Sequence, residues 1–332
     1  MAWESMAPLL LANNGFGVGV SGGKIYTLGG QQNTTGTYEY DPATDAWAAK
    51  ATMPTYHFYH QAATDSSGNI FIVKQDDSNE IRKYVPSTNT WSDITDSAAA
   101  WDGTAGRFNW FVGDGSGNIY QGGGISRTDV NRWAGSAATP TWTNALTTIT
   151  PWAGTPYTGT SAVYYPPNGK IYLMGGREWS TGNPNPVMAE YEPPSTWVTK
   201  TSPPYDLDEP FLVAVPPYIY IIPGSFDPEN IEILRYDPAA DSYSTWIDLP
   251  YSAYRRGAAF IAPYLHVFGG SRLSDAVSLN SHYRTELPGT GYFMGAESDS
   301  FIDPGFTGSD SFDSVFPDDD LYPAEDLYPE SG

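Results

Sequence analysis

Charged side chains that could bind an acidic ligand or move a proton occur in pairs at three points of the sequence. They are Arg177-Glu178, directly after two glycines, Asp208-Glu209 and Arg255-Arg256. A guanidinium group holds an anion through strong hydrogen bonds, and a carboxylate beside it can transfer a proton. The alternative is that these groups form ion pairs between structural elements. We favour this structural interpretation because no further catalytic motif accompanies them.

Few residues could hold a metal ion or a cofactor. His57 and His60 are three positions apart, a spacing that suits a helix, whereas the surrounding sequence is typical of the start of a strand. The run Asp114-Gly-Ser-Gly-Asn118 begins like a calcium loop, but its twelfth position is Ile125 rather than a carboxylate. The chain has no cysteine, and it has neither a phosphate-binding loop nor a nucleophile elbow. We therefore expect no metal and no cofactor.

The elements that must position these side chains follow a repeat. Tryptophans recur at positions 3, 47, 91, 142, 197 and 246, with gaps of 44 to 55 residues. A period of this length predicts one four-stranded unit per repeat. Apolar runs at 24–30, 170–176 and 264–270 each end in two glycines, and a tyrosine follows each of them.

Each part of the repeat has a local physical reason. Tight turns at 65–69, 114–118 and 167–170 contain glycine, which supplies the positive φ that such turns need. The apolar run after a turn predicts a strand buried on both faces. Paired glycines at its end allow two backbones to approach closely. Tyr-Asp-Pro at 40–42 ends the third strand because proline has no N–H. The tryptophan then opens the fourth strand and packs between sheets.

These glycine, tyrosine and tryptophan positions resemble the Kelch family of β-propellers over residues 3–290. The resemblance implies an all-β, six-bladed Kelch-type propeller within residues 1–294. Its first three strands per blade are expected within 11–41, 58–85, 107–135, 158–192, 208–237 and 256–285. Its fourth strands are expected to begin at Trp47, Trp91, Trp142, Trp197 and Trp246. The sixth blade then lacks an outer strand, and we expect Trp3-Glu-Ser-Met6 to supply it and to close the ring.

Alternating strand directions would gather the longer connections at one end of the propeller. These are the second-to-third strand connections and the connections between blades. Long loops on a rigid scaffold are where binding residues are most common. The side chains expected on this binding face are Tyr56, Trp101, Arg107, Trp152, Tyr157, Arg177, Glu178, Trp179, Asp208, Glu209, Tyr254, Arg255, Arg256 and Arg272.

The resemblance leaves the function open, because Kelch propellers include sugar enzymes and non-catalytic binding platforms. The charged pairs on the binding face would look like the site of the family's sialic-acid mutarotases. The resemblance also implies that Arg256, near the start of a first strand, belongs to the scaffold. Copper radical oxidases that share the fold need a tyrosine crosslinked to a cysteine, and this chain has no cysteine.

The C-terminal segment 295–332 differs from the rest of the chain. It holds 11 of the 38 acidic side chains and no lysine or arginine, a composition that does not fold alone. One interpretation is a solvated, disordered tail. The other is an extended arm that binds another protein subunit, since exposed aromatic side chains are unfavourable in water. The aromatic anchors of such an arm are Phe301, Phe306, Phe312, Phe316, Tyr322 and Tyr328.

Charge and hydropathy exclude other classes of partner. A net charge of −22 argues against nucleic acid, whose phosphates need lysine and arginine, and against an anionic membrane surface. No apolar run approaches the length of a bilayer span. Residues 1–6 contain no basic side chain, so we expect no secretory signal peptide. We expect synthesis in the cytoplasm, with any export through a particle released by lysis.

These observations favour a non-catalytic interaction or structural propeller within a larger, multimeric assembly. The composition is rich in Asn, Thr, Gly and Tyr and contains only six lysines. That composition resembles virion structural or host-attachment proteins, including those of bacteriophages, with loops that bind protein or glycan. The alternative is a sugar-active Kelch enzyme resembling the sialic-acid mutarotases.

Overall fold

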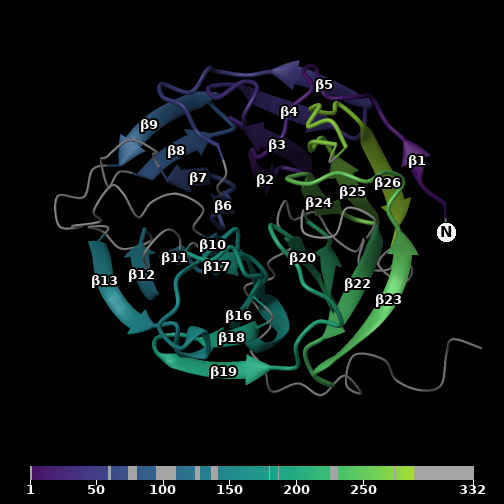
Figure 1. Ribbon diagram of the computed structural model, residues 1–332. Helices are drawn as coiled ribbons and strands as arrows, with labels where there is room; N and C mark the ends of the chain where they lie inside the picture. The colour runs from purple at the N-terminus through teal and green to yellow at the C-terminus, as the bar shows by residue number, and fades with distance from the viewer. Residues whose placement is uncertain are drawn as a thin grey trace, which may run out of the picture. The chain divides into compact units, whose positions relative to one another are not determined.

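The computed structural model describes ten stretches of the chain, all within the first of two units, Met1–Ser300 and Phe301–Gly332. The described stretches are 2–58, 61–73, 81–94, 110–123, 128–135, 141–178, 180–185, 187–224, 231–272 and 274–287. Within the first unit, six four-stranded sheets are arranged as blades around a common centre (Figure 1). The expected six-bladed propeller is confirmed.

Each blade is an antiparallel sheet, and in five blades the spatial order of the strands follows the chain. The first blade contains β2 (Gly17–Ser21), β3 (Lys24–Leu28), β4 (Thr37–Asp41) and β5 (Ala46–Ala49). The second contains β6 (Ala63–Thr64), β7 (Ile70–Val73), β8 (Ile81–Val85) and β9 (Thr90–Ile94). The third contains β10 (Trp110–Gly113), β11 (Asn118–Gly122), β12 (Asp129–Ala134) and β13 (Thr141–Thr148).

The remaining blades repeat this arrangement. The fourth contains β15 (Ser161–Tyr165), β16 (Lys170–Met174), β18 (Met188–Glu192) and β19 (Thr196–Lys200). The fifth contains β20 (Phe211–Val215), β21 (Tyr218–Ile222), β22 (Glu232–Asp237) and β23 (Ser242–Asp248). The sixth contains β24 (Gly257–Ile261), β25 (Tyr264–Phe268), β26 (His282–Glu286) and β1 (Glu4–Ser5). Outside the blades lie β14 (Tyr157–Thr158), β17 (Arg177–Glu178), and the 3₁₀ turns η1 (Thr150–Trp152) and η2 (Pro166–Asn168).

The N-terminal strand closes the ring, as the sequence predicts. Strand β1 pairs antiparallel with β26, with Glu4 opposite Arg284 and Ser5 opposite Tyr283 (Figure 1). The N–H of Met6 then donates to the carbonyl of His282 at 2.9 Å. The last blade therefore combines three strands from the C-terminal side of the unit with one from its start.

The hairpin turns have the chemistry expected of them. Asp65 accepts hydrogen bonds from the backbone N–H groups of Ser67 and Asn69, at 2.9 and 2.8 Å, and its second oxygen binds the Asn69 side chain. Asp114 makes the same contacts with Ser116 and Asn118. These carboxylates are used within the turn, which supports a hairpin rather than a calcium loop. Five of the second strands, β3, β11, β16, β21 and β25, are buried along all but their first residue.

Five of the six recurring tryptophans lie on the fourth strands, and Trp3 directly precedes β1. Trp47, Trp91 and Trp197 each occupy the second position of their strand. In the fifth blade this position is taken by Tyr243, which lies opposite Tyr236. The prediction that Trp246 opens this strand is wrong, because β23 begins at Ser242. Trp246 instead contacts the Tyr220 ring of its own blade at 5.0 Å.

A recurring clamp joins three of the outer strands, β5, β9 and β23, to the blade before them. The indole N–H of Trp91 donates to the carbonyl of Ala51 at 3.0 Å, and the Ala51 N–H donates to Asn89 at 2.8 Å. Ala51, which lies just beyond the outer strand β5, thus makes two hydrogen bonds to the next blade, one through its carbonyl and one through its N–H. The same double contact joins Ala7 to Trp47 and Asp45, and Thr201 to Tyr243 and Asp241. In the fifth blade the Tyr243 hydroxyl therefore donates the hydrogen bond that a tryptophan indole N–H donates in the first and second blades.

The paired glycines lie where neighbouring blades meet. Gly29 has φ +68°, and a Cβ there would lie 2.1 Å from the carbonyl oxygen of His57. The N–H of Gly30 donates to that same carbonyl at 2.8 Å. The pairs of the fourth and sixth blades repeat this contact, from Gly176 to Leu207 at 2.9 Å and from Gly270 to Asn13 at 2.9 Å. The close backbone approach expected from the sequence is therefore an inter-blade junction.

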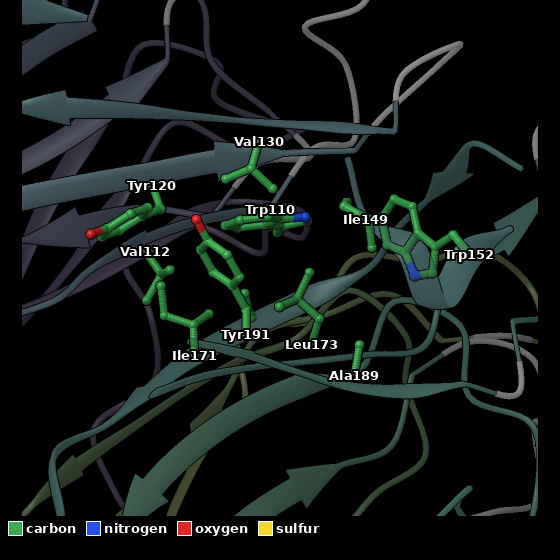
Figure 2. Close-up of a cluster of buried hydrophobic side chains, with 11 residues drawn as sticks. Trp110, Val112, Tyr120, Val130, Ile149, Trp152, Ile171, Leu173, Ala189 and Tyr191 are labelled. Atoms are coloured by element: carbon green, nitrogen blue, oxygen red, sulfur yellow. The ribbon is translucent and has the colours of Figure 1, made fainter. Parts of the chain in front are cut away.

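The hydrophobic core lies between the blades. One cluster combines Trp110 and Tyr120 of the third blade with Ile171 and Tyr191 of the fourth (Figure 2). The rings of Tyr120 and Tyr191 meet edge to face at 6.0 Å. Trp152, on the connection between these two blades, packs into the same cluster. Each blade is thus stabilised mainly by apolar contact with its neighbours. In the described stretches, no helix has the length and hydropathy to cross a bilayer.

Candidate functional site

The strand order gathers the longer connections at one end of the propeller. We call this end the loop face and define it by the described residues of 6–16, 29–36, 50–62, 149–160, 175–187, 201–210, 249–256 and 269–281. The opposite end carries short turns such as 22–23 and 42–45. All eleven of the predicted binding residues that the structure describes lie within the segments of the loop face.

Arg177 and Asp208 form an ion pair between the fourth and fifth blades. Arg177 lies on β17, which pairs with β14 to form a small sheet outside the fourth blade. Its Nε donates to Oδ2 of Asp208 at 2.9 Å, and its Nη2 contacts the same oxygen. The Asp208 side chain is 1% exposed, whereas that of Arg177 is 42% exposed. The hydrogen bond with Asp208 raises the pKa of Arg177 above its ordinary value, so the guanidinium keeps its charge.

Glu209 and Arg255 form a second ion pair, between the fifth and sixth blades. Nε of Arg255 donates to Oε2 of Glu209 at 2.7 Å. Both residues have left-handed backbones, with φ of +50° and +55°, a conformation that is costly for side chains of this kind. Burial raises the pKa of the Glu209 carboxyl, and the Asp208 charge raises it further, while Arg255 opposes the shift. The guanidinium of Arg255 also lies 5.1 Å from the Tyr254 ring centre.

These two pairs make one group, which we call the charge quartet: Arg177, Asp208, Glu209 and Arg255. Its formal charges sum to zero, and its members come from connections of three successive blades. Gly159 of the connection into the fourth blade fits tightly against it. A Cβ at Gly159 would lie 2.8 Å from Cγ of Glu209 and 3.0 Å from Oδ1 of Asp208.

Glu178 does not join the quartet, although it is adjacent to Arg177. Successive side chains of a strand point to opposite faces, and Glu178 accepts hydrogen bonds from the hydroxyls of Ser180 and Thr181, each at 2.7 Å. These bonds hold the pKa of Glu178 below its ordinary value. Its strand neighbour Tyr157 has a raised pKa, through burial and then the charge of Glu178.

The other described candidates lie apart from the quartet. Arg256 is buried and donates to the carbonyls of Ala253 and Tyr251, and burial lowers its pKa to about 10. Arg272 is exposed and pairs with Asp275 at 3.0 Å. Trp152 belongs to the core and meets Tyr157 edge to face at 5.4 Å.

Several predicted residues lie outside the described part of the chain. They are Trp101, Arg107, Trp179 and the tail anchors Phe301, Phe306, Phe312, Phe316, Tyr322 and Tyr328. His60 is also outside it, whereas His57 is fully buried. Within the described stretches, no group of three or more histidine or carboxylate side chains could hold a metal ion.

Exposed aliphatic side chains form a feature that the sequence analysis missed. Leu10, Leu11 and Val277 are 52, 49 and 49% exposed. Backbone hydrogen bonds from Leu9 to Asn280 and from Asn13 to Leu279, at 2.9 and 3.0 Å, hold the two segments together. We call these three residues the aliphatic patch. Tyr56, also on the loop face, is 41% exposed and stacks on Phe58. The adjacent Leu-Leu pair beside a loop was the available sequence signal.

Comparison with known proteins agrees with this architecture. A family model described as the Kelch motif matches residues 12–54, which span the first blade. The structure named YjhT superposes with a TM-score of 0.68 at 12% sequence identity, covering 86% of this chain and 97% of that one. No curated protein matches the sequence.

A second solved structure is a fungal alcohol oxidase of the AA5 family, in complex with copper. It superposes with a TM-score of 0.59 at 18% identity, covering 82% of this chain. The chain spans 62% of the oxidase's length. At these identities the two likenesses concern the fold alone.

Proposed function

Because this chain is a Kelch-repeat β-propeller of six blades, we propose that it is a non-catalytic interaction scaffold that binds other protein subunits. The loop face is the binding surface, and the acidic C-terminal segment 295–332 is a second contact. The observation that carries the proposal is the aliphatic patch on the loop face.

The chemistry of this surface favours a protein partner. Of the five large hydrophobic side chains exposed among the described residues, Leu10, Leu11, Tyr56 and Val277 are on the loop face. Exposed apolar side chains that gather on one face of a protein are typical of binding surfaces. Three of these four are aliphatic, and aliphatic anchors suit apolar pockets of another protein. A glycan would need stacking aromatic rings, and Tyr56 is the exposed aromatic candidate among the residues that the structure describes.

The charged groups of the loop face support a scaffold rather than a catalyst. Asp208 and Glu209 are each bound to an arginine from a neighbouring connection, and Glu178 is bound to two hydroxyls. Ion pairs that cross from one blade to the next fix the loops against each other. A rigid loop face loses less entropy when a partner binds.

The acidic segment suits a partner more basic than the propeller itself. Many cations of the described body are already in ion pairs, namely Lys24, Lys50, Arg82, Lys170, Arg177, Lys200, Arg255, Arg272 and Arg284. Complementary charge on another subunit would guide association. The narrower form of the proposal is a virion component that attaches to a host, and the low-lysine, Asn- and Thr-rich composition supports it.

Photo-crosslinking in the cell that makes the protein tests the proposal. Benzoylphenylalanine at position 11 or 277 should crosslink a protein partner, whereas the same group at Ser87, on the opposite end, should not. The identified partner should bind the purified chain, and Leu11→Asp with Val277→Asp should abolish that binding. Truncation after residue 294, or Ser at Phe301, Phe306, Phe312 and Phe316, should weaken it. Binding that survives both changes would contradict the proposal.

One observation favours a second candidate, a sugar-active enzyme. Glu209 has a raised pKa, lies beside an arginine and has a strained backbone, and these features are enriched at catalytic sites. In this alternative, Glu209 would carry a proton to or from an acidic sugar held by Arg177 and Arg255.

A further inference from the structure

Two buried histidines lie in contact at the point where the ring closes. Nδ1 of His266 on β25 is 3.0 Å from Nε2 of His282 on β26. Nδ1 of His282 is in turn 3.1 Å from the carbonyl oxygen of Ala7, just beyond the closing strand β1. Both imidazoles are at most 1% exposed. A chain of hydrogen bonds therefore runs from the interior of the sixth blade to the N-terminal segment.

The acceptors fix which nitrogens carry protons. A carbonyl can only accept, so Nδ1 of His282 is protonated and Nε2 of this neutral ring accepts from Nδ1 of His266. Nε2 of His266 is then bare, and it is buried without a hydrogen-bond partner. If either ring takes a second proton, the His266 Nε2–H has no acceptor. The site thus accommodates two neutral rings and no imidazolium.

The surroundings offer little compensation for a positive charge. Rings of Tyr40 and Tyr264 contact the histidines, and the Arg284 cation opposes their protonation. Asp45 is the nearby anion, but it already accepts from the Ala7 N–H and the Tyr40 hydroxyl. Glu4 of β1 is paired with Arg284 at 2.7 Å.

Burial, first of all, lowers the pKa of His266 to about 3 and that of His282 to about 4, from an ordinary value of 6.5. A neutral buried pair therefore stabilises the closed ring fully above pH 6.5. As the pH falls below that value, the released form takes up protons and the closed form does not. The stabilisation is lost progressively down to about pH 4, where the closed form also protonates.

We propose that acidification releases the N-terminal segment 2–7 from the sixth blade, with the His266–His282 pair as the trigger. Release frees Ala7 from His282, Trp47 and Asp45 together and exposes the edge of β26. The other five blades do not contain this pair and keep their structure. The propeller would then open where β1 pairs with β26, in a mildly acidic compartment between about pH 6 and pH 5.

A single engineered thiol can follow the release, because the chain has no cysteine. Met6→Cys reports the closing segment and Met188→Cys reports the fourth blade; both methionines are buried in the closed ring. Reaction with 4,4′-dithiodipyridine is measured from pH 7 to pH 5 and divided by the rate for the unfolded chain at each pH. The normalised rate for Met6→Cys should rise by roughly tenfold or more per pH unit below pH 6.5, while that for Met188→Cys stays low.

The histidine variant shows whether the pair is responsible. His266→Phe with His282→Asn removes both titrating rings and keeps an N–H near the Ala7 carbonyl. In this background, the pH dependence of Met6→Cys labelling should be flat. A Met6→Cys rate that does not change with pH would overturn the proposal, and so would equal exposure of Met6→Cys and Met188→Cys. An unchanged pH dependence in the histidine variant would also overturn it.

Discussion

At the scale of single residues, glycine positions show how the sequence encodes the contacts between blades. Gly29 and Gly22 both have positive φ, +68° and +54°. Only Gly29 faces another backbone, the carbonyl of His57 in the connection into the second blade. A glycine in a turn is needed only for its backbone conformation. A glycine where two blades meet is also needed because a side chain there would clash with the neighbouring backbone.

Gly29→Ala should therefore destabilise the protein far more than Gly22→Ala. Both changes carry the cost of a left-handed alanine, about 1 to 2 kcal/mol. Only Gly29→Ala also forces a Cβ to within 2.1 Å of a carbonyl oxygen, which should add at least ~2 kcal/mol through displaced backbone. Urea unfolding of the two variants measures the difference. Equal losses of stability in the two variants would mean that the junction between the first and second blades is not tightly packed at Gly29.

The charge quartet shows where prediction from single residues ends. Its four members were all predicted as binding-face residues, because charged pairs beside loops stand out in the sequence. Their pairing could not be predicted. Arg177 binds Asp208 rather than its neighbour Glu178, since β17 directs the two side chains to opposite faces. That outcome depends on the packing of three connections.

At the scale of strands and blades, the repeating clamp explains why an aromatic donor stands near the start of the outer strands. Trp3, Trp47, Trp91 and Tyr243 each donate to a carbonyl at the end of the preceding blade. A tyrosine and an Asp or Asn five positions later accompany three of the clamps, at 40 and 45, 84 and 89, and 236 and 241. This spacing is visible in the sequence and could have been used to predict the junctions.

Trp91→Phe and Trp197→Phe should separate the hydrogen bond from the packing of the ring. Both rings are half-buried and contact a tyrosine of the third strand, at 5.0 and 4.5 Å. Trp91 donates to Ala51, whereas the buried indole N–H of Trp197 has no partner. Trp91→Phe should therefore lower the free energy of unfolding by about 1 to 2 kcal/mol more than Trp197→Phe does. Chemical denaturation measures this difference, and a larger loss in Trp197→Phe would contradict the role given to the clamp.

Most of the fold followed from elements with a strong local signal. Paired glycines, turn residues and aromatic spacing predicted six blades and their order, and the missing sixth outer strand predicted closure by the N-terminus. The start of β23 was missed because Tyr243 and Trp246 are both aromatic and three positions apart, and only the clamp distinguishes them. The His266–His282 contact was missed because it depends on the register of β25 against β26, and its link to Ala7 depends on the ring closure.

At the scale of the whole propeller, closure of the ring by β1 should contribute a large part of the thermal stability. The segment contributes strand pairing to β26, the Glu4–Arg284 ion pair and the contacts of Ala7. Deletion of residues 1–8 exposes a sheet edge and the apolar wall of the first blade. The melting temperature should fall on the order of 10 °C.

Glu4→Ala is the control for this deletion. It removes only a partly exposed ion pair, which should cost under about 1 kcal/mol. Calorimetry of the wild-type protein, the deletion variant and Glu4→Ala compares their melting temperatures. A melting curve that is unchanged by the deletion would contradict closure of the ring by the N-terminal strand.

The central claim is that the loop face binds without catalysis and that its charge quartet is scaffold. Exchange spectroscopy by NMR tests it directly, by measuring how fast the two anomers of N-acetylneuraminic acid interconvert in the presence of the protein. We predict the rate of buffer alone for the wild-type protein, for Glu209→Gln and for the control Glu178→Gln. A wild-type rate well above buffer that collapses in Glu209→Gln and Arg255→Ala, but not in Glu178→Gln, would contradict the claim and identify a sugar enzyme.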